Sequence, residues 1–124
     1  MFDLKEVQCS GNRFEHRGFV SFYKHVCTSN IQICSLNYCK LELESQLIIP
    51  TFVKKASQMK LLSIEGVGLQ DNIGEMVLQQ VKSHPNLKFL NISNAKLGDR
   101  SCSALIDVLR ENKQIEAIKY EQNL

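Results

Sequence analysis

The sequence has almost no excess of charge of either sign. Its 15 lysines and arginines nearly balance 13 aspartates and glutamates, which leaves a net charge of +2 at pH 7. Electrostatics alone therefore favour neither a nucleic acid nor a membrane surface as a partner. The chain contains no uninterrupted apolar run of about 18 residues, so no membrane-spanning helix is expected. Residues 1–10 have neither a basic start nor an apolar stretch and do not predict a signal peptide.

The patterns of common catalytic and metal sites are also missing. Gly66 and Gly68 are not followed by the lysine and serine of a phosphate-binding loop. Cys34 and Cys39 are five residues apart, which is not a zinc-ligand spacing. The three histidines fall at unrelated positions, with no cysteine or carboxylate at a ligand spacing: His16, His25 and His84. We therefore expect no catalytic residues, no metal and no cofactor.

What the sequence does contain is a repeat of about 28 residues. Five segments begin 27, 28, 28 and 28 residues apart, at Leu4, Ile31, Met59, Leu87 and Ile115. Three positions further on stand Val7, Cys34, Leu62, Leu90 and Ile118. Five positions on stand Cys9, Leu36, Ile64, Ile92 and Tyr120. Ten positions on stand Phe14, Leu41, Leu69 and Leu97, and Leu124 stands nine positions after Ile115. An apolar pattern that recurs at one period in this range is typical of stacked repeat units.

Each full segment predicts a short strand, a turn and a helix of about three turns. The helix is indicated by apolar residues four apart, such as Phe22 and Val26, because these lie on one helix face. Expected strands lie near Lys5–Cys9, Ile33–Leu36, Leu61–Ile64, Phe89–Ile92 and Ala117–Tyr120. Expected helices lie near Gly18–Cys27, Gln46–Ala56, Ile73–Ser83 and Arg100–Asn112.

Three residues give expectations about the ends of these helices. Asp71 and Asp99 occupy the same repeat position just before the third and fourth helices, where a carboxylate can cap free backbone N–H groups. Pro50 fits the second helix only if that helix begins close to Gln46, so that the proline lies in its first turn.

The repeated residues resemble the leucine-rich-repeat pattern L-x-x-L-x-L-x-x-N/C-x-L, and the long helix-bearing unit is similar to the ribonuclease-inhibitor subfamily. In that family the asparagine or cysteine satisfies backbone groups in the turn after the strand. Asn12, Cys39 and Asn123 match it, whereas Val67 and Ala95 do not. The resemblance implies an α/β solenoid with a parallel sheet on its concave side and helices on its convex side. About 4.5 repeats are expected in one domain, residues 1–124, over residues 4–30, 31–58, 59–86, 87–114 and, in part, 115–124.

Neither end of the sequence shows the polar capping unit with which solenoids usually close. Two interpretations remain open. The chain is part of a longer repeat protein, which we favour because natural solenoids cover their ends. Alternatively, it is a complete small protein whose edge strands pair with a partner, including a second copy of itself.

Positions two, four and six residues after each segment start are expected to face solvent. The fourth and sixth are polar, but the second carries Ile33, Leu61 and Phe89 on adjacent strands, with Tyr38 expected beside them. Exposed apolar and aromatic clusters mark interfaces, so we expect another protein to bind there. The alternative is that these residues merely favour strands or lie under an absent segment. The predicted contact residues are Ile33, Leu61, Phe89, Tyr38, Ser35, Ser63, Asn91 and Glu65.

The function expected from the resemblance is that of a non-catalytic protein-binding module. One alternative is a GTPase-activating domain like the Ran activators, although those use a longer array and polar loop residues that Arg13, Lys40 and Lys96 do not reproduce. Another is a structural segment of a larger leucine-rich-repeat receptor or of an actin-capping protein. The five cysteines are expected to be reduced thiols of a cytoplasmic or nuclear protein.

Overall fold

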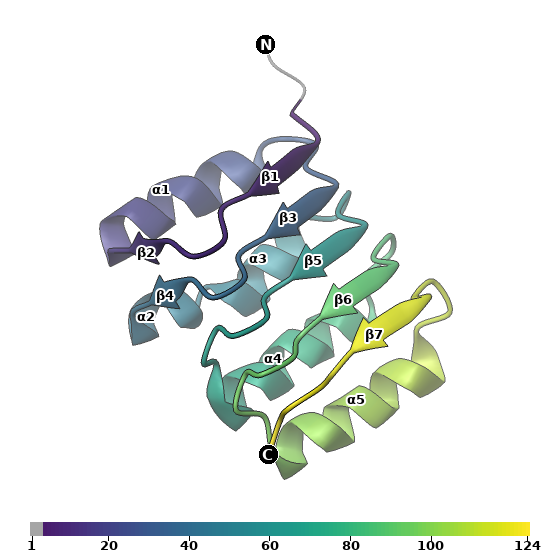
Figure 1. The fold of residues 1–124 in the computed structure, drawn as a ribbon. Helices are drawn as coiled ribbons and strands as arrows, with labels where there is room; N and C mark the ends of the chain where they lie inside the picture. The colour runs from purple at the N-terminus through teal and green to yellow at the C-terminus, as the bar shows by residue number, and fades with distance from the viewer. Residues whose placement is uncertain (1–3) are drawn as a thin grey trace.

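The structure, a computed structural model, describes residues 4–124 and alternates strands with helices along the chain (Figure 1). The elements are β1 (Glu6–Gln8), β2 (Arg13–Phe14), α1 (His16–Cys27), β3 (Ile33–Ser35), β4 (Lys40–Leu41), α2 (Leu43–Gln46), α3 (Ile49–Lys55), β5 (Leu61–Ser63), α4 (Gln70–Lys82), β6 (Phe89–Asn91), α5 (Asp99–Glu111) and β7 (Ala117–Lys119). The expected elements are confirmed apart from the second helix. The two-residue strands β2 and β4, which pair in parallel, were not expected.

Five of the strands form one sheet that is parallel throughout, in the order β1-β3-β5-β6-β7. The register follows the sequence repeat, because Ile33 pairs with Leu61 and Leu61 pairs with Phe89. Figure 1 shows the helices side by side on one face of this sheet. The chain is therefore a parallel α/β protein with a repeat-like architecture.

The core lies between the sheet and the helices. The residues three positions after each segment start are buried in the three inner strands, where Cys34, Leu62 and Leu90 are 0–2% exposed. The equivalent residues of the outer strands, Val7 and Ile118, are only partly buried because each outer strand has a neighbour on one side. All five cysteines are free thiols, and burial raises the pKa of Cys34 to about 12.

The turn after each strand explains the mixed asparagine or cysteine position. The Asn12 amide donates to the Cys9 carbonyl at 2.8 Å, and the Cys39 thiol donates to the same carbonyl at 3.0 Å. Asn123 accepts from the amide of Ala95 at 2.9 Å. Val67 and Ala95 are instead buried in the apolar core. Those two turns therefore have apolar packing in place of the polar side-chain contact.

The second helix is divided, which differs from the single helix expected over Gln46–Ala56. The short helix α2 ends at Gln46, and α3 begins at Ile49 with Pro50 in its first turn. Proline has no backbone N–H to give to a preceding turn, so one continuous helix through this position would lose a hydrogen bond and clash with the chain before it. The restart at Ile49 places Pro50 where its missing donor costs nothing.

Two buried polar residues occupy the same position in consecutive units. The Nδ1 atom of His84 accepts from the amides of Asn86 and Leu87, and its Nε2 contacts the Ala56 carbonyl at 3.0 Å. Asn112, 28 residues later, accepts through Oδ1 from the amides two and three residues further on, at 2.7 and 3.1 Å. Its amide group donates back to the Val81 carbonyl. Each side chain thus joins the end of one helix to the unit before it.

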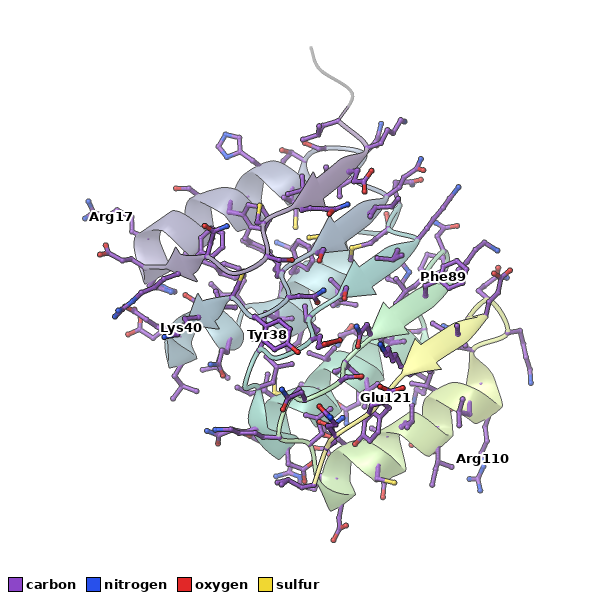
Figure 2. The ribbon with its side chains drawn as sticks, in the orientation of Figure 1. Arg17, Tyr38, Lys40, Phe89, Arg110 and Glu121 are labelled. Atoms are coloured by element: carbon purple, nitrogen blue, oxygen red, sulfur yellow. The ribbon has the colours of Figure 1, made fainter. Side chains whose placement is uncertain are left out.

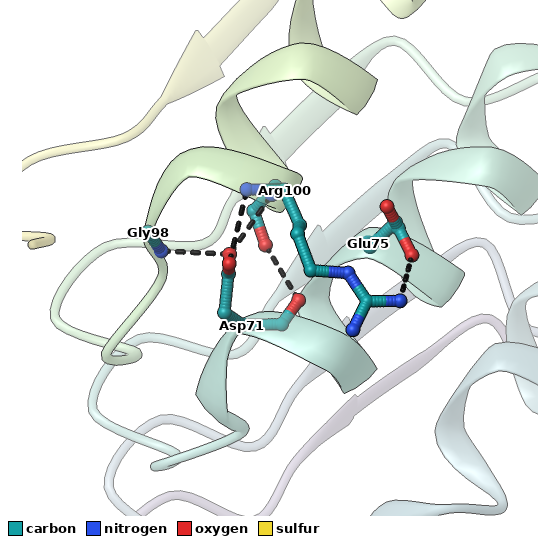
Figure 3. Close-up of polar contacts among 5 residues, drawn as sticks. Asp71, Glu75, Gly98 and Arg100 are labelled. Atoms are coloured by element: carbon teal, nitrogen blue, oxygen red, sulfur yellow. Dashed lines mark hydrogen bonds and ion pairs between the residues drawn. The ribbon is translucent and has the colours of Figure 1, made fainter.

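Asp71 corrects the expectation that it caps its own helix. It lies in the first turn of α4, and its carboxylate instead accepts from amides at the start of α5: Gly98 at 2.7 Å, Arg100 at 3.0 Å and Ser101 at 2.8 Å (Figure 3). These amides belong to the group that an α-helix leaves without internal acceptors. Burial raises the pKa of the Asp71 carboxyl, but the hydrogen bonds outweigh it and lower the pKa from 3.8 to about 2.

Replacing Asp71 with alanine is expected to lower the melting temperature by several degrees, because three amides of α5 lose their acceptor. The depressed pKa means that this stabilisation is present above pH 3.8 and is lost as the pH falls towards 2. Thermal unfolding of the wild type and Asp71→Ala between pH 2 and 7 measures both effects.

Asp99→Ala is the matched control for this prediction. Asp99 has the same repeat position, is exposed, and makes no side-chain hydrogen bond within the described part of the chain. Its loss should change the melting temperature little. An equal drop in both variants would contradict the role assigned to Asp71.

Candidate partner-binding face

One face of the five-stranded sheet carries no helices (Figure 1); we call it the open face. Parallel sheets are usually covered on both faces, and their strands are then apolar throughout. The strands here alternate instead, because the side chains that point to the helices are apolar and most of those on the open face are polar. Any large apolar residue on the open face is therefore an exception that needs an explanation.

The exception is a row of three apolar side chains, Ile33, Leu61 and Phe89, which we call the apolar stripe. They are directly paired residues on β3, β5 and β6, so neighbouring members lie about 4.8 Å apart in the direction across the strands. Phe89 is 42% exposed, and the other two are partly exposed. The stripe ends at Glu6 on β1 and at the small residue Ala117 on β7. The expected row of apolar residues on adjacent strands is confirmed.

A depression of about 480 Å³ lies along part of the stripe. Leu61, Phe89 and Ala117 supply its apolar wall, and Ser63, Asn91 and Lys119 follow them towards the strand ends. The depression has room for an apolar group of a partner against Leu61, Phe89 and Ala117. Polar groups beside it on the partner would then contact Ser63, Asn91 and Lys119. Ala117 and Lys119 were not predicted as contact residues, although the repeat placed them in the same rows as Phe89 and Asn91.

Tyr38 does not lie beside the stripe, which corrects the sequence-based prediction. Figure 2 shows it beyond the end of β3, whereas Phe89 lies at the start of β6. Its backbone is left-handed, with φ of 57°, and its ring covers Gly66 so closely that a Cβ there would overlap it. Tyr38 remains 54% exposed. Tyr38 therefore belongs to a second exposed surface, in the turn that follows β3.

Tyr38 belongs to a polar network centred on Glu65. The Tyr38 hydroxyl donates to one carboxylate oxygen at 2.8 Å, and the Asn91 amide donates to the other at 3.0 Å. The bonds from Asn91 and Tyr38 lower the pKa of Glu65, and the bond to Glu65 raises the pKa of Tyr38. Asn37 was not predicted, yet its Oδ1 accepts from the Ser63 hydroxyl at 2.6 Å and the Glu65 amide at 2.9 Å. These hydrogen bonds hold the side chains of Tyr38, Glu65, Asn91 and Asn37 in place without a bound partner.

The two serines among the predicted contact residues have different surroundings. The Ser35 hydroxyl lies 3.1 Å from the Ser10 hydroxyl and stays partly exposed. Ser63 is only 9% exposed and holds Asn37 in place. Ser63 therefore positions the network and offers little surface of its own.

One arrangement elsewhere has the composition of a hydrolase triad. Nδ1 of His16 lies 3.0 Å from the Ser45 hydroxyl, and its Nε2 lies 3.6 Å from a Glu44 carboxylate oxygen. Ser45 is completely buried, so no substrate can reach its hydroxyl. Within residues 4–124 no group of three or more histidine, cysteine or acidic side chains could hold a metal ion. No helix in this range has the length and apolar character needed to cross a membrane.

Comparison with protein-family models and with curated proteins finds no match for this chain. The open face and its apolar stripe therefore provide the basis for a functional assignment.

Proposed function

We propose that this chain is a leucine-rich-repeat solenoid of the ribonuclease-inhibitor type, with the open face on its concave side. Support comes from the agreement between the sequence period and the strand register, since residues about 28 apart pair directly along the sheet. Further support comes from the buried positions of the pattern, which carry Leu36, Ile64 and Ile92 at 0–1% exposure.

We also propose that the open face binds another protein and that the chain is not an enzyme. The observation that carries this proposal is the apolar stripe on a sheet face that no helix covers. Keeping Leu61 and Phe89 partly in water leaves apolar area without the stabilisation that burial provides, about 25 cal/mol per Å². A partner that covers the stripe would bury this apolar area and so gain that stabilisation. The nearly neutral net charge of +2 gives no comparable reason to propose a nucleic acid.

The decisive experiment compares capture of partners from native lysate by the wild type and by the double variant Leu61→Asp, Phe89→Asp. Two carboxylates at the centre of the stripe would have to be desolvated by the partner. We expect recovery of a specific partner, identified by mass spectrometry, to fall at least tenfold. A tenfold loss corresponds to about 1.4 kcal/mol of binding free energy.

The control carries the same number of new charges outside the open face. Leu47 and Met76 are 47% and 40% exposed, and they lie at the end of α2 and on α4. Leu47→Asp, Met76→Asp should retain the partner. Circular dichroism establishes that both variants are folded. Equal retention by the two double variants would exclude the stripe as the binding site.

The GTPase-activating alternative is tested directly by single-turnover GTP hydrolysis on a Ran-type GTPase, with and without this chain. We expect no acceleration. Arg13 and Lys40 are paired residues of β2 and β4 and are both exposed, but no other feature of that edge favours GTPase activation. A hydrolysis rate that rises with the concentration of the chain would contradict the non-catalytic proposal.

A further inference from the structure

The charge of the open face is opposite in sign to that of the whole chain. The side chains two, four and six positions after each segment start supply this face, and four of them are charged at pH 7: Glu6, Glu65, Lys119 and Glu121. Three carboxylates and one ammonium group give the face a net charge of −2, whereas the whole chain has +2. The open face is therefore acidic, which disfavours a phosphate backbone or an anionic membrane surface as its ligand.

Two of the carboxylates lie in one row beside the apolar stripe. Glu65 and Glu121 each follow the row of the stripe by four residues, so about 13 Å separates the two rows along the strands. Ser93 lies between them in the same row and is only 3% exposed, so no large side chain stands between the carboxylates. Glu121, beyond the end of β7 (Figure 2), lies 4.0 Å from the Lys119 ammonium group. Both side chains of this pair are more than half exposed, so the pair contributes little and leaves Glu121 available to a partner.

The other side of the stripe has the opposite sign. A lysine directly precedes the first residue of β5 and of β6: Lys60 and Lys88. The two are neighbours across the sheet, because the Lys88 amide donates to the Lys60 carbonyl at 2.8 Å. Lys60 is exposed, and the Lys88 ammonium group lies 3.6 Å from a Glu116 carboxylate oxygen. A partner that covers the stripe therefore has lysines on the side of the strand starts and carboxylates on the side of the strand ends.

The position of the stripe restricts the form of the segment that can cover it. An extended segment pairs its backbone with a sheet only along an edge strand. The stripe lies on β3, β5 and β6, which have neighbouring strands on both sides. A helix satisfies its own backbone groups, and helices usually cover both faces of parallel sheets. Residues i and i+7 of a helix are about 10.5 Å apart along its axis, which matches the roughly 10 Å from Ile33 through Leu61 to Phe89.

We propose that the open face binds an amphipathic α-helix of the partner, which lies across the strands with apolar residues on the stripe and arginines or lysines on the flank facing Glu65 and Glu121. This inference rests on the proposed function and adds the form and the charge of the bound segment. A helix with its side chains is about 10–12 Å wide, so basic side chains on one flank can reach a row about 13 Å from the stripe. Reversing the helix direction would turn the same flank towards Lys60, so the charges also fix the direction.

Two synthetic helical peptides test the proposal. The first has leucine at positions i, i+4 and i+7, arginine along one flank, alanine and glutamine elsewhere, and a lactam bridge that keeps it helical. The second has glutamate in place of every arginine. In fluorescence anisotropy with the full chain at low salt, the arginine peptide should bind at least tenfold more tightly. Equal affinities overturn the proposal, and so does the absence of binding by either peptide at about 1 mM.

Variants of the acidic row test where the basic flank binds. Glu65→Gln, Glu121→Gln should weaken binding of the arginine peptide at least fivefold. Asp99→Asn, Asp107→Asn removes the same charge from exposed positions of α5 and should bind like the wild type. Because Glu65 also accepts from Tyr38, the single variant Glu121→Gln, which leaves that hydrogen bond intact, should show part of the loss. Circular dichroism establishes that the variants are folded, and unchanged affinity in both glutamate variants overturns the proposal.

Capture from lysate separates a failure of this inference from a failure of the proposed function. A natural partner that requires Leu61 and Phe89, combined with peptides that bind equally or not at all, would overturn the basic helix and leave the stripe as the binding site. A natural partner retained by Leu61→Asp, Phe89→Asp would overturn both proposals.

Discussion

His84→Leu is expected to lower the free energy of unfolding by about 3 kcal/mol, although leucine is similar in size and is itself apolar. His84 is 4% exposed and satisfies three backbone groups: the amides of Asn86 and Leu87 and the carbonyl of Ala56. Leucine offers no replacement for any of them. A buried backbone group left without a partner costs about 1–3 kcal/mol. Chemical denaturation of the wild type and the variant measures the difference.

His84→Asn is the informative control, because the chain already uses asparagine at this position one unit later. Asn112 is 7% exposed and accepts from the amides of Gln114 and Ile115 in the same way. An asparagine at position 84 should therefore retain most of the stability that leucine loses. If both variants are destabilised equally, the packing of the imidazole ring matters and its hydrogen bonds do not.

The same residue gives a pH dependence with a definite sign. Nδ1 accepts two hydrogen bonds and therefore cannot take up a proton without losing them. Burial lowers the pKa of His84 below 6.5, against the opposite effect of the bond to Ala56. Its stabilisation is present above pH 6.5 and is lost as the pH falls towards the lower pKa of the folded state, by at most about 1.4 kcal/mol per pH unit. The difference between wild type and His84→Asn should shrink accordingly between pH 7 and 5.

The period of the sequence was sufficient to predict the sheet. Residues about 28 apart fall into direct register, so the burial of Leu62 and Leu90 and the row of Leu61 and Phe89 followed from the pattern alone. The prediction succeeds because every unit packs its strand against the equivalent strand of the next unit in the same register. A strand shifted by one residue would turn its apolar side chains to the open face.

Contacts between units could not be predicted in the same way. Asp71 has the sequence position of a cap for its own helix, but the free amides of the following helix lie within its reach. The direction of Tyr38 depends on its left-handed backbone and on the missing side chain of Gly66. The left-handed backbone recurs at the same position of every unit, at Gly11, Tyr38, Gly66, Asn94 and Gln122. Only Tyr38 carries a ring there, so its contact with Gly66 and its hydrogen bond to Glu65 emerged only from the structure.

Gly74→Ala provides the clearest test of packing between units, because two effects with opposite signs compete. Alanine is the better residue inside a helix by up to about 1 kcal/mol. The added methyl group, however, would overlap the Leu97 side chain and the Ser101 hydroxyl. Both are completely buried, and the hydroxyl also donates to the Asp71 carbonyl at 2.9 Å, so neither can move freely.

We expect overpacking to prevail and Gly74→Ala to lower the free energy of unfolding by about 1–3 kcal/mol. Gly18→Ala is the matched control, because Gly18 is an exposed residue of α1 and a Cβ there meets nothing within 4 Å. That change should raise stability by about 0.5 kcal/mol through helix propensity alone. Urea denaturation of both variants measures the change in the free energy of unfolding, which should be negative for Gly74→Ala and positive for Gly18→Ala. A stabilised Gly74→Ala would mean that α4 and α5 are less closely packed than the buried contact of Gly74 with Ser101 requires.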